Sequence, residues 1–269
     1  MKEIARRTSQ AAPRVQAFEF NDLSACPRFL RESIIESLGN GLRWGRVFDG
    51  VGPVFADFCR RAGCESVLDL CSGSGEPVSM LLEALARQGL PPVRFVLSDL
   101  LPNTAAMERV SGRHPGLVEV TREPVDATCV PTHLDRPART IINALHHFPP
   151  DVAARLIADA VAKRRALFIV ESFPRSLARM AATLPALGIA ALANPFLTPQ
   201  DRWLKAFSTY AVPLVPVIGL WDAAVSALRI HDQDDLRAMA ARASAYDWEY
   251  REIPFFPGGR AMAFFGIPL

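Results

Sequence analysis

Short runs of β-branched and aliphatic residues alternate with helical patterns through the middle of the chain. The runs expected to form strands are residues 66–70, 93–97, 117–120, 139–143 and 166–170. Between them, helical patterns cover residues 77–87, 103–110 and 151–163. Strands that alternate with helices at this spacing predict a parallel sheet with helices on both faces. The near-continuous Val, Ile and Leu content of the runs is typical of strands buried on both sides.

The pattern changes at the C-terminal end of the chain. Residues 248–255 and 260–267 are strand-like, and they flank the turn-forming sequence Pro257-Gly258-Gly259. Two strand-like runs around such a turn predict a β-hairpin.

Two further segments have mostly helical patterns. About 60 residues precede the first strand, and residues 27–38 among them place apolar side chains at helical spacing. Pro27 fits the start of this helix, and Gly39 is its expected C-cap. About 75 residues separate the fifth strand from the hairpin. This is long for a crossover connection, so we interpret the segment as an inserted cap.

Composition narrows the class of protein. Half of the 269 residues are hydrophobic, which suits one large domain or one core with an elaborated cap. The formal net charge is +2 and no nucleic-acid recognition motif appears, so no nucleic-acid partner is expected. The five cysteines are odd in number and form no C-x-x-C pair, which argues against a disulfide framework or a zinc site. This content fits a cytoplasmic location, and the first residues lack the apolar region of a secretory signal.

Two apolar stretches approach the composition of a membrane span. Leu184–Leu197 is too short to cross a bilayer, and residues 211–230 contain Pro213, Pro216 and Asp222. A spanning helix needs about 20 apolar residues with few charges. We therefore expect buried or interfacial helices, and peripheral contact with a membrane stays open.

The sequence V-L-D-L-C-S-G-S-G-E-P over residues 67–77 carries the strongest chemical signal. A strand ends at Asp69 and Leu70, and a turn with two glycines leads into a helix. Glycine accepts positive φ angles and lets a ligand approach the backbone closely. In doubly wound folds, ligands bind at the carboxyl ends of the strands. A dinucleotide fingerprint would need a third glycine at Val78, and Glu76 would repel a pyrophosphate, so both residues argue against an NAD-type oxidoreductase.

The stretch D-L-C-S-G-S-G resembles motif I of class I S-adenosylmethionine-dependent methyltransferases, which commonly reads D-x-G-x-G-x-G. Cys71 replaces the first glycine, a change that is tolerable where the position needs no positive φ. The resemblance implies a Rossmann-like, seven-stranded, mostly parallel sheet with an antiparallel C-terminal strand. It also implies that S-adenosylmethionine is the cofactor.

The resemblance continues along the chain. Asp99 closes the second strand, where the family's motif II accepts hydrogen bonds from ribose hydroxyls, and Asp126 falls where the family contacts adenine. Residues 141–148 and 167–171 resemble motifs IV and V. The cofactor-binding residues implied in this way are Asp69, Cys71, Ser72, Gly73, Gly75, Asp99, Leu100, Asp126, Ala127 and Asn143. No metal site is expected, because the candidate acidic residues are scattered over different loops.

We expect the chain to divide into three parts. Residues 1–60 are predicted to form a helical N-terminal lid segment, and residues 61–172 with 246–269 are predicted to form the Rossmann-like cofactor-binding core. Residues 173–245 are predicted to form a helical cap insertion.

Two adjacent histidines follow the fourth strand and are expected to border the pocket. A histidine can take a proton from a hydroxyl, an amine or an acidic carbon near neutral pH. Either His146 or His147 is therefore a candidate general base, and the sequence does not rank them. The alternative is that both only shape the pocket. Asn143 is expected either to bind the adenosyl or methionyl end of the cofactor or to stabilise a local turn.

Aromatic residues in the two helical segments are candidates for an apolar substrate pocket: Phe18, Phe20, Trp44, Phe48, Phe173 and Trp203. The alternative is that they form the core of a helical cap. As a group they favour a small apolar or aromatic acceptor molecule, methylated on oxygen, nitrogen or carbon. The competing hypothesis is an S-adenosylmethionine-binding or lipid-surface module without turnover. The oligomeric state does not follow from the sequence.

Overall fold

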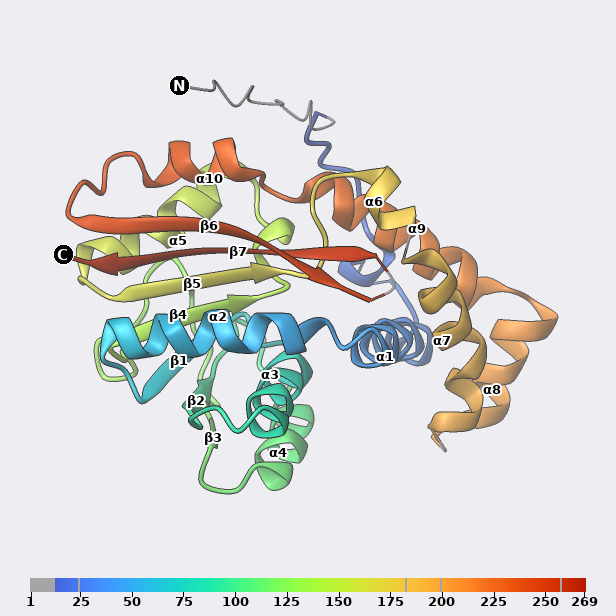
Figure 1. Ribbon diagram of the computed structural model, residues 1–269. Helices are drawn as coiled ribbons and strands as arrows, with labels where there is room; N and C mark the ends of the chain where they lie inside the picture. Colours follow the sequence, from blue (N-terminus) through green and yellow to red (C-terminus); the bar gives the residue numbers. More distant parts are fainter. Residues whose placement is uncertain (1–12, 24, 182, 199, 257) are drawn as a thin grey trace.

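The computed structural model describes residues 13–23, 25–181, 183–198, 200–256 and 258–269 (Figure 1). Within these residues, seven strands form one sheet in the order β3-β2-β1-β4-β5-β7-β6. β7 runs antiparallel to both of its neighbours, whereas the pairs among β1 to β5 are parallel. The predicted fold class is therefore confirmed. The strands are β1 Ser66–Leu70, β2 Arg94–Leu97, β3 Val118–Val120, β4 Ala138–Ile142, β5 Ala166–Glu171, β6 Tyr246–Phe255 and β7 Gly259–Pro268.

Helices cover both faces of the sheet. On one face lie α2 (Val47–Ala62), α3 (Glu76–Arg87) and α4 (Thr104–Arg113), and their apolar side chains share a core cluster with the sheet. Phe55 of α2, for example, meets Phe168 of β5 edge to face at 5.2 Å. On the other face, α5 (Pro150–Ala162) and α10 (Gln233–Ala240) share a second cluster with the strands. Residues of both faces are buried, which explains the near-continuous apolar runs in the sequence.

Helix α1 (Arg28–Trp44) continues past the expected C-cap at Gly39, so the predicted helix end was wrong. The helix also contains Gly41, where an added Cβ would lie 2.7 Å from the Cδ2 atom of Leu187. Helix α1 packs against α7 (Leu184–Leu197), and the absent side chain permits this close approach. Packing of this kind offsets the roughly 1 kcal/mol that a glycine costs inside a helix.

Most of the segment predicted to be a cap forms five helical elements, and we use the name cap for these alone: α6 (Leu177–Ala181), α7 (Leu184–Leu197), α8 (Arg202–Ala206), the π-helix η3 (Phe207–Ala211) and α9 (Leu214–Arg229). It projects from the edge of the sheet at which β5 ends (Figure 1). A third apolar cluster, with Ile34 of α1, Ala191 of α7 and Val215 of α9, joins it to α1. Among the described residues, no single helix has the length and apolarity of a membrane span. Arg202–Ala211 and Leu214–Arg229 meet those criteria only as a pair, and they are bent by 77°.

One charged side chain lies inside the core. Arg139 of β4 is fully buried, and its guanidinium forms ion pairs with Asp135 at 3.0 Å and with Asp159 at 2.7 Å. Asp159 also pairs with Lys163 at 2.8 Å. A buried cation is tolerated only when it is paired in this way, so these contacts hold β4 and α5 together.

Candidate active site

The buried side chain of Asp69 fixes the loop between β1 and α3. Its carboxylate is buried and accepts hydrogen bonds from the hydroxyls of Ser72 and Thr140, both at 2.6 Å. Burial raises the pKa of Asp69 to about 7, although the two hydrogen bonds act in the opposite direction. The expectation that Asp69 lines the ligand is therefore corrected: both oxygens are used beneath the loop, where they fix its conformation.

Three residues of this loop have positive φ angles: Cys71 at 59°, Gly73 at 55° and Gly75 at 78°. The assumption that Cys71 needs no positive φ was wrong, and a non-glycine residue in this region costs about 1–2 kcal/mol. A Cβ on Gly75 would lie 2.7 Å from the Cδ1 atom of Leu97, so only glycine fits there. A Cβ on Gly73 would meet no atom within 4 Å, so the backbone at this position is open to a ligand.

The second strand places Asp99 directly beside the loop. Its carboxylate accepts hydrogen bonds from the backbone N–H of Gly73 and of Leu101, each at 2.9 Å. The carbonyl of Asp99 accepts from the N–H of Val125 at 2.8 Å, which brings the next loop alongside. In that loop Asp126 is exposed and Ala127 is buried, while Leu100 is exposed beside Asp99. The fold thus gathers these residues from three separate segments at one edge of the sheet.

Asn143 follows β4 and has a φ of 53°. Its side-chain oxygen accepts hydrogen bonds from the backbone N–H of Ser172 at 2.7 Å and from the Ser172 hydroxyl at 2.8 Å. Within the described residues, the buried Nδ2 atom has no partner. Buried amide donors are nearly always paired, so this donor is suited to an acceptor atom on a ligand.

A cavity of about 510 Å³ lies between this edge of the sheet and the cap. Its walls come from α1, α7 and α9 and are mostly apolar, whereas its polar end comes from the segments after β4 and β5 and from residues 19–22. Asn143, His146, His147, Glu171 and Phe173 all border it. A mostly apolar cavity with a few polar groups at one end is the usual form of a small-molecule site.

His146 is held by Glu171 at the end of β5. The Nδ1 atom lies 2.8 Å from one carboxylate oxygen, and the other oxygen accepts from the backbone N–H of His146 at 3.0 Å. Because a carboxylate can only accept, Nδ1 is the donor in this pair, and Nε2 is the ring nitrogen left to accept a proton. His146 is 8% exposed, so this nitrogen is largely shielded from bulk water.

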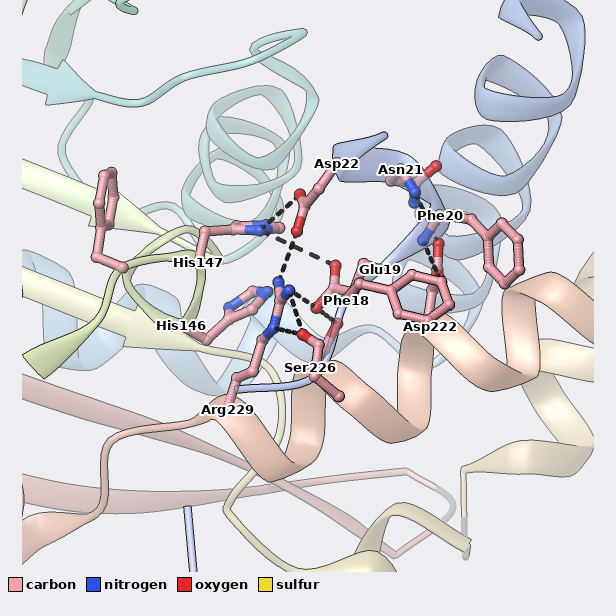
Figure 2. A network of polar contacts seen from close by, with 12 residues as sticks. Phe18, Glu19, Phe20, Asn21, Asp22, His146, His147, Asp222, Ser226 and Arg229 are labelled. Atoms are coloured by element: carbon pink, nitrogen blue, oxygen red, sulfur yellow. Dashed lines mark hydrogen bonds and ion pairs between the residues drawn. The ribbon is translucent and has the colours of Figure 1, made fainter. Parts of the chain in front are cut away.

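His147 has different partners (Figure 2). Its Nδ1 atom lies 3.3 Å from Asp22, and Arg229 bridges Asp22 at 2.7 Å and Glu19 at 3.1 Å. Burial lowers the pKa of His147, but the hydrogen bond to Asp22 and the charges of Glu19, Asp22 and Glu171 outweigh it, so the pKa is raised. The hydrogen bond from His147 lowers the pKa of Asp22 to about 2. This arrangement favours a protonated His147 that pairs with an ionised Asp22.

Glu19, His146 and His147 also offer ligand atoms that all lie within 4.8 Å of one another. The sequence did not indicate this group, because Glu19 is distant from the histidines in the chain. A metal ion requires neutral imidazoles, and the raised pKa of His147 opposes that state. The guanidinium of Arg229, 3.1 Å from Glu19, adds a positive charge that opposes a metal cation there.

Of the aromatic residues proposed for the pocket, Phe173 borders the cavity and the other five do not. Phe48 is 2% exposed and belongs to the core beneath the sheet, because it lies on the inward face of α2. Trp203 is 85% exposed on α8, and Trp44 is 44% exposed at the end of α1. Phe18 and Phe20 contact each other at 5.2 Å outside the cavity, and Phe18 also packs against Trp221. Helical aliphatic residues that the sequence did not single out form the walls instead: Ile34, Leu38, Leu42, Leu187, Val215 and Leu220.

No protein-family model and no curated protein matches the sequence. Among solved structures, an O-methyltransferase family protein from Burkholderia thailandensis is 17% identical, with 81% of this chain and 55% of that chain covered and a TM-score of 0.45. A magnesium protoporphyrin IX methyltransferase from Synechocystis with bound SAH is 13% identical. The match covers 88% of this chain and 100% of that chain, with a TM-score of 0.47. An O-methyltransferase from neocarzinostatin biosynthesis, solved with S-adenosylmethionine and a naphthoic acid, is 13% identical, with 77% and 50% covered and a TM-score of 0.44.

The chain spans about half the length of the first and third of these proteins. With TM-scores below 0.5 and identities below 25%, these likenesses carry no argument about the function of this chain. The strand order of the chain, with β7 inserted antiparallel between β5 and β6, is that of the class I, Rossmann-like methyltransferase fold.

Proposed function

We propose that the protein transfers a methyl group from S-adenosylmethionine to a small, largely apolar acceptor that carries an acidic hydroxyl group. The observation that carries this proposal is the His146–Glu171 pair at the polar end of an apolar cavity. The pair leaves Nε2 of an imidazole free to accept a proton in a residue that borders the same cavity as Asn143.

The residues present fit the cofactor. Gly73 exposes its backbone, Asp99 offers a carboxylate at the end of β2, and Asn143 has a buried Nδ2 donor without a partner in the described part of the chain. These residues would hold the adenosyl and methionyl groups. When bound, S-adenosylmethionine supplies a methyl group that its sulfonium has already activated.

The chain then needs to orient the acceptor, exclude water and move one proton. Nε2 of His146 accepts the proton of the acceptor hydroxyl, and the charge of Glu171 stabilises the imidazolium that forms. Glu171 also fixes the ring through its second contact, with the backbone of the same residue. The apolar walls from α1, α7 and α9 keep water away from the acceptor and raise the strength of these electrostatic contacts.

Release of S-adenosylhomocysteine in the presence of apolar phenols, such as 1-naphthol, tests this proposal. Turnover with apolar phenols and none with polar amines or peptides is the expected result. Binding of S-adenosylhomocysteine without turnover on any acceptor of this class would instead favour a cofactor-binding module. The size of the cavity, about 510 Å³, sets the range of acceptors for the panel.

Replacement of Asp99 with asparagine is expected to weaken S-adenosylhomocysteine binding by about 10- to 100-fold. The amide oxygen can still accept from the Gly73 N–H, so the loop is preserved, but the charged acceptor is lost, and a hydrogen bond to a charged group contributes about 1.5–3 kcal/mol. Isothermal titration calorimetry measures the change. The exposed Asp151, which pairs with Arg155 on α5, provides the control Asp151→Asn. Equal affinities for the Asp99 variant and the unmodified protein would remove the ribose-binding role of this residue.

A further inference from the structure

The cap presents large apolar side chains to its surroundings. We define the cap patch by six residues of α7, α8, η3 and α9 that are 50–85% exposed: Ile189, Phe196, Trp203, Phe207, Val217 and Leu220. Figure 1 shows these helices as a lobe that projects away from the sheet. Scattered apolar residues are common on protein surfaces, but six large exposed ones on helices that contact one another indicate an interaction site.

The cap patch has almost no charge. Between Arg179 and Asp222 the sequence contains three charged residues, Asp201, Arg202 and Lys205. Lys205 is 2% exposed and pairs with Glu36 of α1 at 2.7 Å, which fastens the lobe to the rest of the molecule. A soluble surface normally carries about 25–35% charged residues. The lobe therefore lacks the charges with which a polar protein partner would pair.

The cap patch is continuous with the cavity. Ile35 and Leu38 of α1 and Leu220 of α9 line the cavity and are also 43%, 36% and 50% exposed. The apolar interior thus reaches the surface where the exposed apolar residues begin. A second copy of the chain bound over this surface would cover the opening, whereas a bilayer would leave an apolar acceptor a water-free route into the cavity.

We propose that the lobe docks on a lipid bilayer and inserts the cap patch into the interface of one leaflet. The bent pair formed by residues 202–211 and Leu214–Arg229 has the length and composition of a membrane segment, but the 77° bend and the tie to Glu36 suit insertion from one side. Trp203 and Tyr210 have the amphipathic rings that favour the headgroup level. The identity of the acceptor rests on the proposed function: if the cap patch docks in this way, the acceptor is a hydrophobic molecule dissolved in the bilayer.

Flotation of the full chain with palmitoyl-oleoyl phosphatidylcholine vesicles tests the docking. Binding is expected to persist in 1 M NaCl, because salt screens charges but does not weaken burial of apolar surface. The double variant Phe196→Glu, Trp203→Glu is expected to partition about 100-fold less, since burying each of these side chains contributes a factor of about 10 or more. The matched control is Phe256→Glu, which alters a side chain that is 77% exposed in the turn between β6 and β7, and it should bind vesicles normally.

Two outcomes would overturn the proposal. One is that the unmodified chain stays with the soluble fractions at every lipid concentration. The other is that it sediments as a dimer in the absence of lipid and that the double variant makes it monomeric, which would assign the cap patch to a second copy. The milder variant Phe196→Ser, Trp203→Ser repeats the test if the glutamates prevent folding. S-adenosylhomocysteine affinity is measured on the same samples. Absence of vesicle binding by the unmodified chain with cofactor binding intact contradicts the docking alone, whereas vesicle binding without cofactor binding contradicts the proposed function alone.

Discussion

Replacement of His146 with alanine is expected to lower the single-turnover rate of methyl transfer by about 10²–10⁴-fold, with S-adenosylhomocysteine affinity nearly unchanged. This is the range that a positioned general base contributes. We propose His146 for this role because Glu171 occupies its Nδ1 atom at 2.8 Å, which leaves Nε2 without that partner, and because the residue borders the cavity. Rapid mixing of enzyme, S-adenosylmethionine and an accepted phenol, followed by quantification of the methylated product, measures the rate.

The matched control is His147→Ala in the neighbouring residue, whose ring centroid lies 4.2 Å from that of His146. Asp22 holds Nδ1 of His147 at 3.3 Å and raises its pKa, so His147 is a poor proton acceptor. Its loss should reduce the rate much less than the loss of His146. An unaltered rate in His146→Ala, or a larger loss in His147→Ala, would contradict the assignment.

Replacement of Arg139 with alanine is expected to reduce the free energy of unfolding by about 3–5 kcal/mol. The guanidinium is fully buried, and its removal leaves an empty space in the core. It also takes one cationic partner each from Asp135 and Asp159, which keep only Arg165 and Lys163. Removing one partner of a buried ion pair typically costs this much. Urea denaturation followed by circular dichroism gives the value.

The control for this prediction is Arg155→Ala on α5. Arg155 pairs with Asp151 on the surface, with side chains that are 60% and 70% exposed. Exposed pairs contribute less than about 1 kcal/mol, so this variant should unfold at nearly the same urea concentration as the unmodified protein. Similar stability losses in both variants would show that the buried pairs of Arg139 do not hold β4 against α5.

The sheet could be predicted because its strands are short, apolar and regularly spaced. Each of the five parallel strands lies within two residues of its expected bounds, and the hairpin forms from β6 and β7. Pro257 of the predicted turn lies outside the described residues. The turn between β1 and α3 was also predictable, since its glycines directly follow a buried strand, whereas its binding of a cofactor stays a prediction. The division into lid segment, core and cap stays a prediction.

The features that the sequence did not predict depend on contacts between segments that are distant in the chain. His146 and His147 are adjacent in sequence, and only the positions of Glu171 and Asp22 in the fold distinguish them. Aromatic residues of the cap repeat at helical spacing, but the spacing does not say which face meets the cavity, so Phe48 was placed in the pocket although it lies in the core. Gly39 resembled a helix end because glycine is a common C-cap. The helix continues to Trp44, and the packing of Leu187 against Gly41 leaves no signal in the local sequence.

The proposed function depends above all on binding of S-adenosylmethionine by the loop between Leu70 and Glu76, at the carboxyl edge of the sheet. Calorimetric titration of ligand-stripped protein with S-adenosylhomocysteine tests it most directly, with Gly75→Val as the companion variant because a side chain there meets Leu97. We expect saturable binding at one site per chain in the unmodified protein and its loss in the variant. If the unmodified protein shows no measurable binding, the proposed function is wrong.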